Sequence, residues 1–368
     1  MTSVRGGYGF QLKASNAPLQ RVQLPTLTPA PDEVVIEVAG CGVCHTDVAF
    51  AIDGVPTRHQ LPLILGHEIS GRVVAAGGQV GNWLGRSVIV PAVISCGVCP
   101  ACRAGRPSVC RQQFMPGNDG NGGFATQALV PARGLCAVPE ILPSGTTLAM
   151  LSVVADAVTT PYEAIRRSGL GPDDVAVFVG VGGVGGFGVQ IAAALGAAVV
   201  AIDVDRERLD LVSQHGARLV LEADSTDLKG LRAAVRTFSK ESARKGIGLK
   251  IFEMSGTPAG QITAFGLLDH GAYLAVVGFT PKPVELRLSN LMAFDATARG
   301  NWGCPPDQYP AALRLVLEGK VTLSPFIEMH ELDDAPAIME AVKKHALRQR
   351  VILRPRRSEQ NLSMETAQ

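Results

Sequence analysis

Four cysteines close together in the sequence could bind a metal ion. Cys96, Cys99, Cys102 and Cys110 follow the spacing C-x2-C-x2-C-x7-C. Four thiolates this close suit a tetrahedral zinc ion with no open coordination position, which would be a structural metal. An iron–sulfur cluster is the alternative, because short C-x2-C runs also hold such clusters. Disulfides are disfavoured, since neighbouring cysteines on one tight loop strain the bond geometry.

A glycine-rich run could bind a dinucleotide. The sequence G-V-G-G-V-G at 180–185 follows an apolar segment and precedes a helical pattern. In such loops the first glycine permits a tight turn, the second lets the backbone approach a pyrophosphate, and the third lets helix and strand pack closely. A glycine-rich packing turn is the alternative, but Asp203 ends the next strand at the spacing of an acid that binds the ribose 2′-hydroxyl. Because a carboxylate there repels a 2′-phosphate, the sequence predicts NAD, bound by Gly180, Gly182, Gly183, Val184, Gly185 and Asp203.

Cysteine, histidine and acidic residues at 44–47 and 66–68 form a second candidate metal site. Cys44 and His67 could be two of the three protein ligands that leave a zinc ion one open position. Asp47 is placed to hold a ligand histidine through its second ring nitrogen. Taken singly, a buried cysteine or an interior histidine is more often part of the core. The metal interpretation gains weight because a dinucleotide motif and a four-cysteine loop share the chain.

The pattern of apolar segments changes along the chain. In the first third, β-branched runs broken by Gly and Pro predict a mainly β unit with strands at 33–38, 69–75, 87–93 and 126–130. From about residue 174, strands alternate with helical patterns, which predicts a parallel, doubly wound α/β sheet with strands at 175–179, 199–202, 249–252 and 273–277. We expect helices at 182–195, 206–215, 310–318 and 335–344, and a last strand at 351–353. A Rossmann unit inserted into a β-rich domain fits this pattern best.

Composition and charge limit the class of protein. The 368 residues, 46% of them hydrophobic, are typical of a globular chain with two domains. A net charge of +1 favours neither nucleic acid nor a membrane surface as partner. No apolar stretch is long enough to span a bilayer, and residues 1–20 lack the pattern of a secretory signal. Most of the eight cysteines are clustered, as in metal sites of cytosolic proteins, so we expect a cytoplasmic protein.

Together these motifs resemble those of the medium-chain, zinc-containing alcohol dehydrogenases. The matching segments are G-V-C-H-T-D at 42–47, G-H-E at 66–68, the four-cysteine loop and G-V-G-G-V-G at 180–185, in the same order and at similar distances. The resemblance covers nearly the whole chain and implies an NAD-dependent enzyme with one catalytic and one structural zinc. It also implies a GroES-like catalytic domain, 1–157 and 301–368, into which an NAD-binding Rossmann domain, 158–300, is inserted.

The resemblance assigns Cys44 and His67 as ligands of the catalytic zinc, with Glu68 as an occasional alternate ligand. The family's third ligand lies just before a Thr and a Tyr, where this chain reads D-A-V-T-T-P-Y at 156–162. The usual cysteine is therefore replaced by Asp156. A carboxylate is a competent zinc ligand, harder than a thiolate. We therefore expect a Cys44–His67–Asp156 site.

Other family positions map onto this chain residue by residue. The resemblance implies that Thr46 contacts the substrate oxygen and starts the proton relay, that His45 faces the cofactor pyrophosphate, and that Thr160 lies near the nicotinamide. Arg350 matches a basic residue near the cofactor phosphates, with an ordinary surface arginine as the alternative. Many relatives have a histidine at the end of the relay, where this chain has Ala49. The relay is therefore expected to end in solvent or at another base.

The resemblance implies that a hydride passes from an alcohol carbon to NAD. By overall likeness and length, the chain also resembles the dehydrogenases of 6-hydroxycyclohex-1-ene-1-carbonyl-CoA, a cyclic allylic secondary alcohol of anaerobic aromatic-compound degradation. We therefore expect a CoA-linked cyclic alcohol, with simple alcohols, polyols and aldehydes as the alternative. A zinc-free reductase would lack both metal motifs, and a non-enzymatic NADH sensor would need no open metal site. The family further implies a homodimer or homotetramer joined through the Rossmann sheets.

Overall fold

The computed structural model describes residues 3–224, 226–242, 248–344 and 346–356, which fall into two compact units. Unit 1 comprises Met1–Ala155 and Ile327–Gln368, and unit 2 comprises Asp156–Phe326. Residues 301–326, expected in the catalytic domain, cluster with unit 2, where α9 (Tyr309–Leu317) packs on α3 (Thr159–Ser168). The division into a catalytic and an NAD-binding domain is a division by function, and it stays a prediction.

Unit 1 consists mainly of β-strands. Its larger sheet has the order β15-β16-β3-β5-β6-β8, with β7 also paired to β3, and its smaller sheet has the order β2-β1-β4. The strands are β1 (Tyr8–Leu12), β2 (Gln20–Gln23), β3 (Glu33–Gly42), β4 (Leu63–Ile64), β5 (Glu68–Ala76), β6 (Ser87–Val90), β7 (Gln127–Pro131), β8 (Cys136–Ala137), β15 (Ile327–Glu331) and β16 (Arg350–Arg354). The helical segments are α1 (His45–Ala51), α2 (Pro100–Arg103), α10 (Ala335–Lys343) and the short turns η1 (Gly81–Trp83), η2 (Pro107–Val109), η3 (Met150–Ala155) and η6 (Leu332–Asp334).

Alternating apolar residues hold the larger sheet of unit 1 on its core. Val34, Ile36 and Val38 of β3 join the core cluster, together with Ile69 and Val73 of β5. Successive strand residues point to opposite faces, so this spacing of two aligns one face with the core. The pairing of β3 with β5 thereby fixes the two segments that carry the candidate ligands, one after the end of β3 and one at the start of β5.

Unit 2 is a parallel sheet with the strand order β11-β10-β9-β12-β13-β14. This is the order of two mononucleotide-binding halves that meet at the first strand of the sheet, as in the Rossmann fold. The strands are β9 (Val175–Val179), β10 (Ala198–Asp203), β11 (Ala217–Glu222), β12 (Leu249–Glu253), β13 (Tyr273–Val276) and β14 (Thr297–Gly300). The remaining helical segments are α4 (Gly185–Ala194), α5 (Arg206–Ser213), α6 (Leu228–Glu241), α7 (Pro258–Gly266), α8 (Ser289–Ala293), η4 (Pro306–Gln308) and η5 (Ser324–Phe326).

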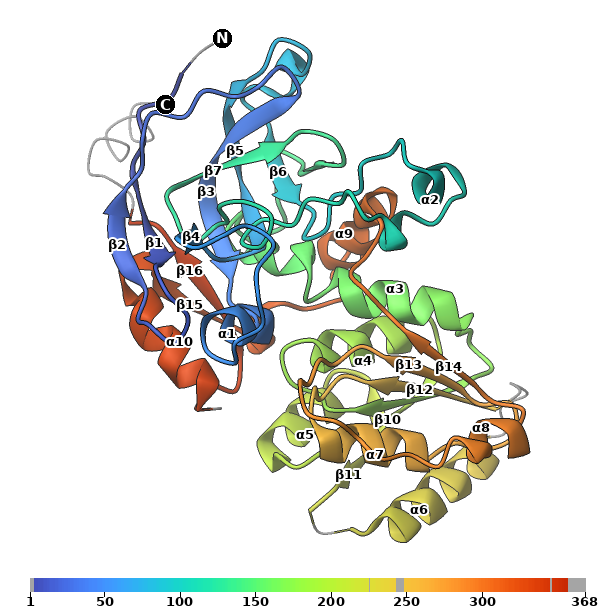
Figure 1. Ribbon diagram of the computed structural model, residues 1–368. Helices are drawn as coiled ribbons and strands as arrows, with labels where there is room; N and C mark the ends of the chain where they lie inside the picture. Colours follow the sequence, from blue (N-terminus) through green and yellow to red (C-terminus); the bar gives the residue numbers. More distant parts are fainter. Residues whose placement is uncertain (1–2, 225, 243–247, 345, 357–368) are drawn as a thin grey trace. The chain divides into compact units, whose positions relative to one another are not determined.

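Helices cover both faces of the sheet of unit 2. In Figure 1, α3 and α4 lie on one face and α6 and α7 on the other. A strand covered on both faces must be apolar throughout, and every residue of β9 is buried. Local signals begin the helices: the side chains of Asp205 and Asp227 accept backbone N–H groups at the starts of α5 and α6, and Thr257 does so for α7.

The expected elements agree with the structure where an apolar pattern was continuous. Strands β9, β10 and β12 lie within a residue or two of their predictions, whereas α4 begins at Gly185 because 180–184 form a loop before it. The strand expected at 87–93 ends at Val90. The apolar pattern did not reveal α1, α3, α6, α7, β11, β14 or β15.

Candidate active site

One buried carboxylate links the two segments that carry the candidate zinc ligands. Cys44 is the N-cap residue of α1, and its backbone N–H donates to Asp47 Oδ2 at 2.9 Å. Asp47 Oδ1 accepts the backbone N–H of Gly66 at 3.1 Å and lies 3.4 Å from His67 Nδ1. Its position beside Nδ1 agrees with the expected role of Asp47 and favours Nε2 of His67 as the nitrogen for a metal.

Two glycines make room for the segment that contains His67 and Glu68. Gly66 has a φ of +96°, and a Cβ there would lie 2.6 Å from the ring of Phe124. A Cβ at Gly42, the last residue of β3, would lie 1.9 Å from Glu68 Oε2. The G-H-E and G-V-C-H-T-D motifs therefore need their glycines for close approach and for a left-handed backbone.

Four donor side chains converge on one point. The ligand atoms of Cys44, His67, Glu68 and Asp156 lie within 4.8 Å of one another. The first three residues are buried and Asp156 is half-buried. Asp156 directly follows Ala155, at the point where the chain passes from unit 1 to unit 2. A thiolate, an imidazole and a carboxylate are donors of catalytic zinc sites, so the residues present fit a zinc ion.

Arg350 holds the carboxylate of Glu68. Its Nε donates to Oε2 at 3.2 Å, and its Nη2 contacts Oε1. The side chains of Arg350 and Glu68 are 6% and 0% exposed. The alternative that Arg350 is an ordinary surface arginine is therefore wrong. Strands β16 and β5 lie on either side of β3 in the sheet of unit 1, and this order brings the two side chains together. A role of Arg350 near the cofactor phosphates stays a prediction.

Thr46, predicted to start the proton relay, and His45, predicted to face the cofactor pyrophosphate, lie in the first turn of α1. Thr46 is half-buried, and its Oγ1 accepts a hydrogen bond from Cys44 Sγ at 3.6 Å. His45 is exposed, whereas Ala49 is buried with 3% exposure. Position 49 therefore offers no polar side chain to a proton relay.

Thr160 holds Asp156 through two contacts. The Thr160 hydroxyl donates to Asp156 Oδ1, and the Thr160 backbone N–H donates to the Asp156 carbonyl at 2.8 Å. Thr160 is 8% exposed. The residue predicted near the nicotinamide therefore also orients the carboxylate predicted to bind zinc.

The clustered cysteines have the separations of a tetrahedral metal site. Cys99 Sγ lies 3.5 Å from Cys102 Sγ and 3.8 Å from Cys110 Sγ. Cys96 Sγ lies 4.0 Å from Cys102 Sγ. Zinc–sulfur bonds of about 2.3 Å in a tetrahedron place sulfurs about 3.8 Å apart, and all four cysteines are free thiols. Backbone hydrogen bonds, foremost that of Val98, lower the pKa of Cys96 to about 6, whereas desolvation by burial raises the pKa of Cys102 to about 11.

The glycines of the 180–185 loop differ in what surrounds them. Gly180 has a φ of +87°, and a Cβ there would lie 2.5 Å from the backbone of Ser255. A Cβ at Gly185 would lie 1.9 Å from the carbonyl oxygen of Gly180. The atom nearest to a Cβ at Gly182 would be Nη1 of Arg208, at 3.3 Å. Gly180 and Gly185 are therefore required by the packing of the protein itself, whereas Gly182 leaves space beside a cationic group.

Asp203 anchors this loop, and Arg208 lies beside it. Asp203 Oδ2 accepts the backbone N–H of Val181 at 2.7 Å, and Oδ1 accepts those of Val204 and Asp205 at 2.8 and 3.0 Å. Arg208 belongs to none of the sequence motifs. Its signal was a basic residue in the first turn of the helix that follows Asp203, which places a guanidinium next to Gly182.

Comparisons with known proteins agree with this geometry. Family models match at residues 30–140, for the alcohol dehydrogenase GroES-like domain, and at 183–318, for zinc-binding dehydrogenase. An alcohol dehydrogenase of Geobacillus stearothermophilus is 28% identical over 91% of this chain and 95% of its own length. The alcohol dehydrogenase structure from Aeropyrum pernix superposes with a TM-score of 0.83 at 26% identity, covering 95% of this chain and 100% of its own. An L-threonine 3-dehydrogenase of Xanthomonas oryzae is 30% identical over 76% of this chain and 80% of its own length.

The chain belongs to the zinc-containing medium-chain alcohol dehydrogenases. This alcohol dehydrogenase is an NAD-dependent enzyme, and the predicted α/β fold with a Rossmann sheet and a β-rich GroES-like part is confirmed. Its two donor groups fit two zinc ions. Because the family binds zinc, a zinc ion is favoured over an iron–sulfur cluster at the four cysteines. Among the residues described, none of the helices combines the length and the hydrophobicity needed to span a membrane.

Proposed function

We propose that this dehydrogenase oxidises a secondary alcohol to a ketone, with the cyclic allylic alcohol 6-hydroxycyclohex-1-ene-1-carbonyl-CoA as the first substrate candidate. The observation that carries the oxidation is the convergence of Cys44, His67 and Asp156 within 4.8 Å. The CoA-linked substrate is supported by overall sequence likeness alone. A simple alcohol, a polyol or an aldehyde is the alternative, and the relatives named alcohol dehydrogenase favour a simple alcohol.

The residues around the donor group suggest how the proton of the alcohol leaves. Cys44, His67 and Asp156 would hold a zinc ion, which would supply a Lewis acid that lowers the pKa of an alcohol, and NAD would supply the hydride acceptor. We assign the proton to the hydroxyl of Thr46, which is half-buried and hydrogen-bonded to Cys44. Since Ala49 provides no base, the proton passes from Thr46 to solvent or to another base.

The side chain of Asp156 is oriented for metal binding by Thr160. A carboxylate can turn about its last bond, and the hydrogen bond from the Thr160 hydroxyl to Oδ1 restricts that motion. Outer partners of this kind are typical of metal ligands and are needed for full affinity. Thr160 therefore couples the predicted metal ligand to the predicted nicotinamide position.

Two arginines that could bind an anionic group, Arg58 and Arg111, give a CoA substrate little direct support. Arg58 Nη1 lies 3.3 Å from Asp119 Oδ1, so its charge is already balanced. Arg111 is exposed. A CoA group would therefore be bound mainly through contacts other than the Arg58 ion pair.

A substrate screen that follows NADH absorbance tests the proposal. Simple alcohols, polyols and the cyclic hydroxy-enoyl-CoA are compared side by side at equal concentration. A kcat/KM at least tenfold higher for the cyclic CoA alcohol than for the others would support the first candidate. Equal or better turnover of a simple alcohol or polyol would contradict it and favour the alternative.

The zinc ligands are tested separately. Cys44→Ser and Asp156→Ala should abolish turnover and lower the zinc content while NADH binding stays largely intact. Asp156→Cys, which restores the family's usual donor, should keep both zinc and activity. Turnover like that of the wild type in Cys44→Ser or Asp156→Ala would contradict the assignment.

We also propose that the protein forms a homodimer or homotetramer through β14. This strand lies at the edge of the sheet of unit 2, and all four of its residues are exposed. Leu288 and Met292 of the preceding segment are 67% and 79% exposed. An exposed strand edge beside apolar side chains favours pairing with another copy. A monomeric mass for the wild type in light scattering would contradict the proposal, whereas dissociation by Leu288→Glu would support it.

A further inference from the structure

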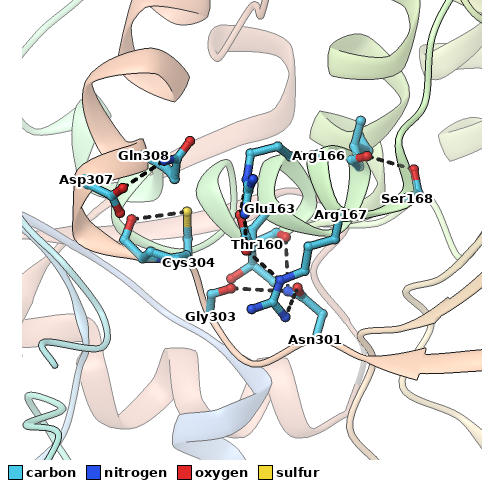
Figure 2. A network of polar contacts seen from close by, with 12 residues as sticks. Thr160, Glu163, Arg166, Arg167, Ser168, Asn301, Gly303, Cys304, Asp307 and Gln308 are labelled. Carbon is cyan, nitrogen blue, oxygen red and sulfur yellow. Dashed lines mark hydrogen bonds and ion pairs between the residues drawn. The ribbon is translucent and has the colours of Figure 1, made fainter. Parts of the chain in front are cut away.

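A buried carboxylate in unit 2 lies outside the donor groups described above. Glu163 of α3 is 0% exposed. Its Oε1 lies 2.6 Å from Arg167 Nε, and its Oε2 lies 2.7 Å from Arg166 Nε (Figure 2). A buried charge needs a buried partner. Arg166 is 48% exposed and Arg167 only 15% exposed, so Arg167 is the more effective of the two.

Arg167 continues the network to Asn301, the residue that follows β14. Arg167 Nη1 donates to Asn301 Oδ1 at 3.3 Å. Asn301 Nδ2 donates to the carbonyl oxygens of Thr160 and Gly303 at 3.3 and 3.2 Å. A guanidinium only donates and a carbonyl only accepts. The amide of Asn301 therefore has one orientation that satisfies these three partners, and Arg167 selects it.

Two segments far apart in the sequence are tied together in this way. Asn301 connects the segment 301–303 to the first turn of α3, which contains Thr160 (Figure 2). Thr160 in turn donates to the carboxylate of Asp156. A displacement of Asn301 would therefore change the position of Thr160, which is predicted to lie near the nicotinamide, and through Thr160 that of the predicted metal ligand Asp156.

The sheet topology places this connection in the nicotinamide half of the unit. Dinucleotides bind across the carboxyl ends of parallel strands, with one nucleotide over each half of the sheet. Asp203 ends β10 and assigns the adenosine side to β9-β10-β11. The other half is β12-β13-β14, and Asn301 stands at the carboxyl end of β14.

We propose that Asn301, held by Arg167 and Glu163, is a positioning residue that fixes the backbone at Thr160 and at 301–303 for binding the nicotinamide ring. The proposal rests on the predicted place of Thr160 near the nicotinamide. It is independent of the identity of the alcohol. Asn301 acts through the backbone groups that it holds, and it takes no part in proton or hydride transfer.

Binding of NADH and of ADP-ribose tests this role, because ADP-ribose lacks only the nicotinamide. In Asn301→Leu, similar in size but without hydrogen-bonding groups, NADH binding should weaken by about 5- to 20-fold, the effect of one lost hydrogen-bonded position. ADP-ribose binding should stay within about twofold, since it keeps the adenosine, the pyrophosphate and the second ribose and lacks only the ring for which the backbone is held. The nicotinamide fluorescence of bound NADH should also shift toward that of free NADH.

Arg167→Leu and Arg166→Leu form a matched pair. Both remove a cation from Glu163, but only Arg167 contacts Asn301. Arg167→Leu should reproduce the selective loss of NADH affinity, and Arg166→Leu should not. Should Arg167→Leu fail to fold, Asn301→Ser, a smaller change at the far end of the network, takes its place and should show the same selectivity.

Three results would overturn the proposal. Asn301→Leu could bind NADH as the wild type does, lose affinity equally for NADH and ADP-ribose, or be matched in its defect by Arg166→Leu. Absence of NADH binding by the wild type would overturn the cofactor assignment on which the proposal rests. An unexpected alcohol in the substrate screen would leave all these binding results unchanged. A failure of the proposed substrate can therefore be distinguished from a failure of the role proposed for Asn301.

Discussion

The ion pair between Glu68 and Arg350 should be essential to the stability of unit 1. Replacing Arg350 by methionine keeps most of the side-chain volume but removes the guanidinium from a carboxylate with 0% exposure. Removing one partner of a buried pair costs about 3–5 kcal/mol, because the other charge stays buried. At about 2–4 °C per kcal/mol for a domain of this size, the unfolding midpoint should fall by about 6–20 °C.

Two further variants make this prediction specific. Arg354→Met removes an exposed pair from the same strand, where Arg354 is 53% exposed and lies 3.0 Å from Glu331, so it should cost less than about 1 kcal/mol. Glu68→Gln combined with Arg350→Met removes both buried charges and should recover most of the lost stability.

Calorimetry at one scan rate measures the midpoints, with protein treated with a chelator alongside the zinc-loaded form. The chelated form matters because Glu68 also belongs to the donor group, and a bound metal could compensate for the missing guanidinium. The reasoning would be refuted if Arg350→Met were no less stable than Arg354→Met in the chelated protein. A double variant as unstable as Arg350→Met alone would refute it equally.

Three further predictions follow from other parts of the chain. Cys99→Ser should leave one zinc per chain instead of two by elemental analysis and lower the unfolding midpoint, and two retained zinc ions would contradict the assignment. Asp203→Ala should weaken NAD binding about tenfold and reduce the preference for NAD over NADP, because the repulsion of a 2′-phosphate is gone. Titration with both cofactors measures the ratio of the two dissociation constants, and an unchanged ratio would contradict the role predicted for Asp203. Burial raises the pKa of Glu253 above its ordinary value of 4.5, so the folded protein binds this proton more tightly than the unfolded chain. The stabilising contribution of this proton is complete below pH 4.5 and is lost as the pH rises through the raised pKa. The unfolding midpoints of the wild type and of Glu253→Gln should therefore diverge over that pH range. Midpoints that change in parallel with pH would contradict this prediction.

The sequence was most informative where chemistry depends on short spacing. The four cysteines and the 180–185 glycines lie within single loops, so the order of residues alone limits their geometry. The strands of unit 2 were predictable for a similar reason, since a strand buried on both faces is a continuous apolar run, as in β9.

Contacts between distant segments were not predictable in this way. Glu68 and Arg350 are 282 positions apart, and Arg167 and Asn301 are 134 positions apart. Neither apolar periodicity nor motif spacing indicates which strand will lie beside which. The partner of Arg350 therefore became clear only from the strand order of unit 1, and the role proposed for Asn301 only from the position of β14.

The carboxylate of Asp156 affects how sensitive the predicted zinc site would be to oxidation. A thiolate, a carboxylate and a neutral imidazole carry two negative charges, as many as the two thiolates and imidazole usual in this family. The exchange therefore preserves the charge balance around a divalent metal. It also removes one sulfur that peroxide could convert to a sulfenic or sulfinic acid, whereas carboxylates do not undergo this chemistry. Oxidative damage to the predicted ligand set would thus concentrate on Cys44, which is 8% exposed.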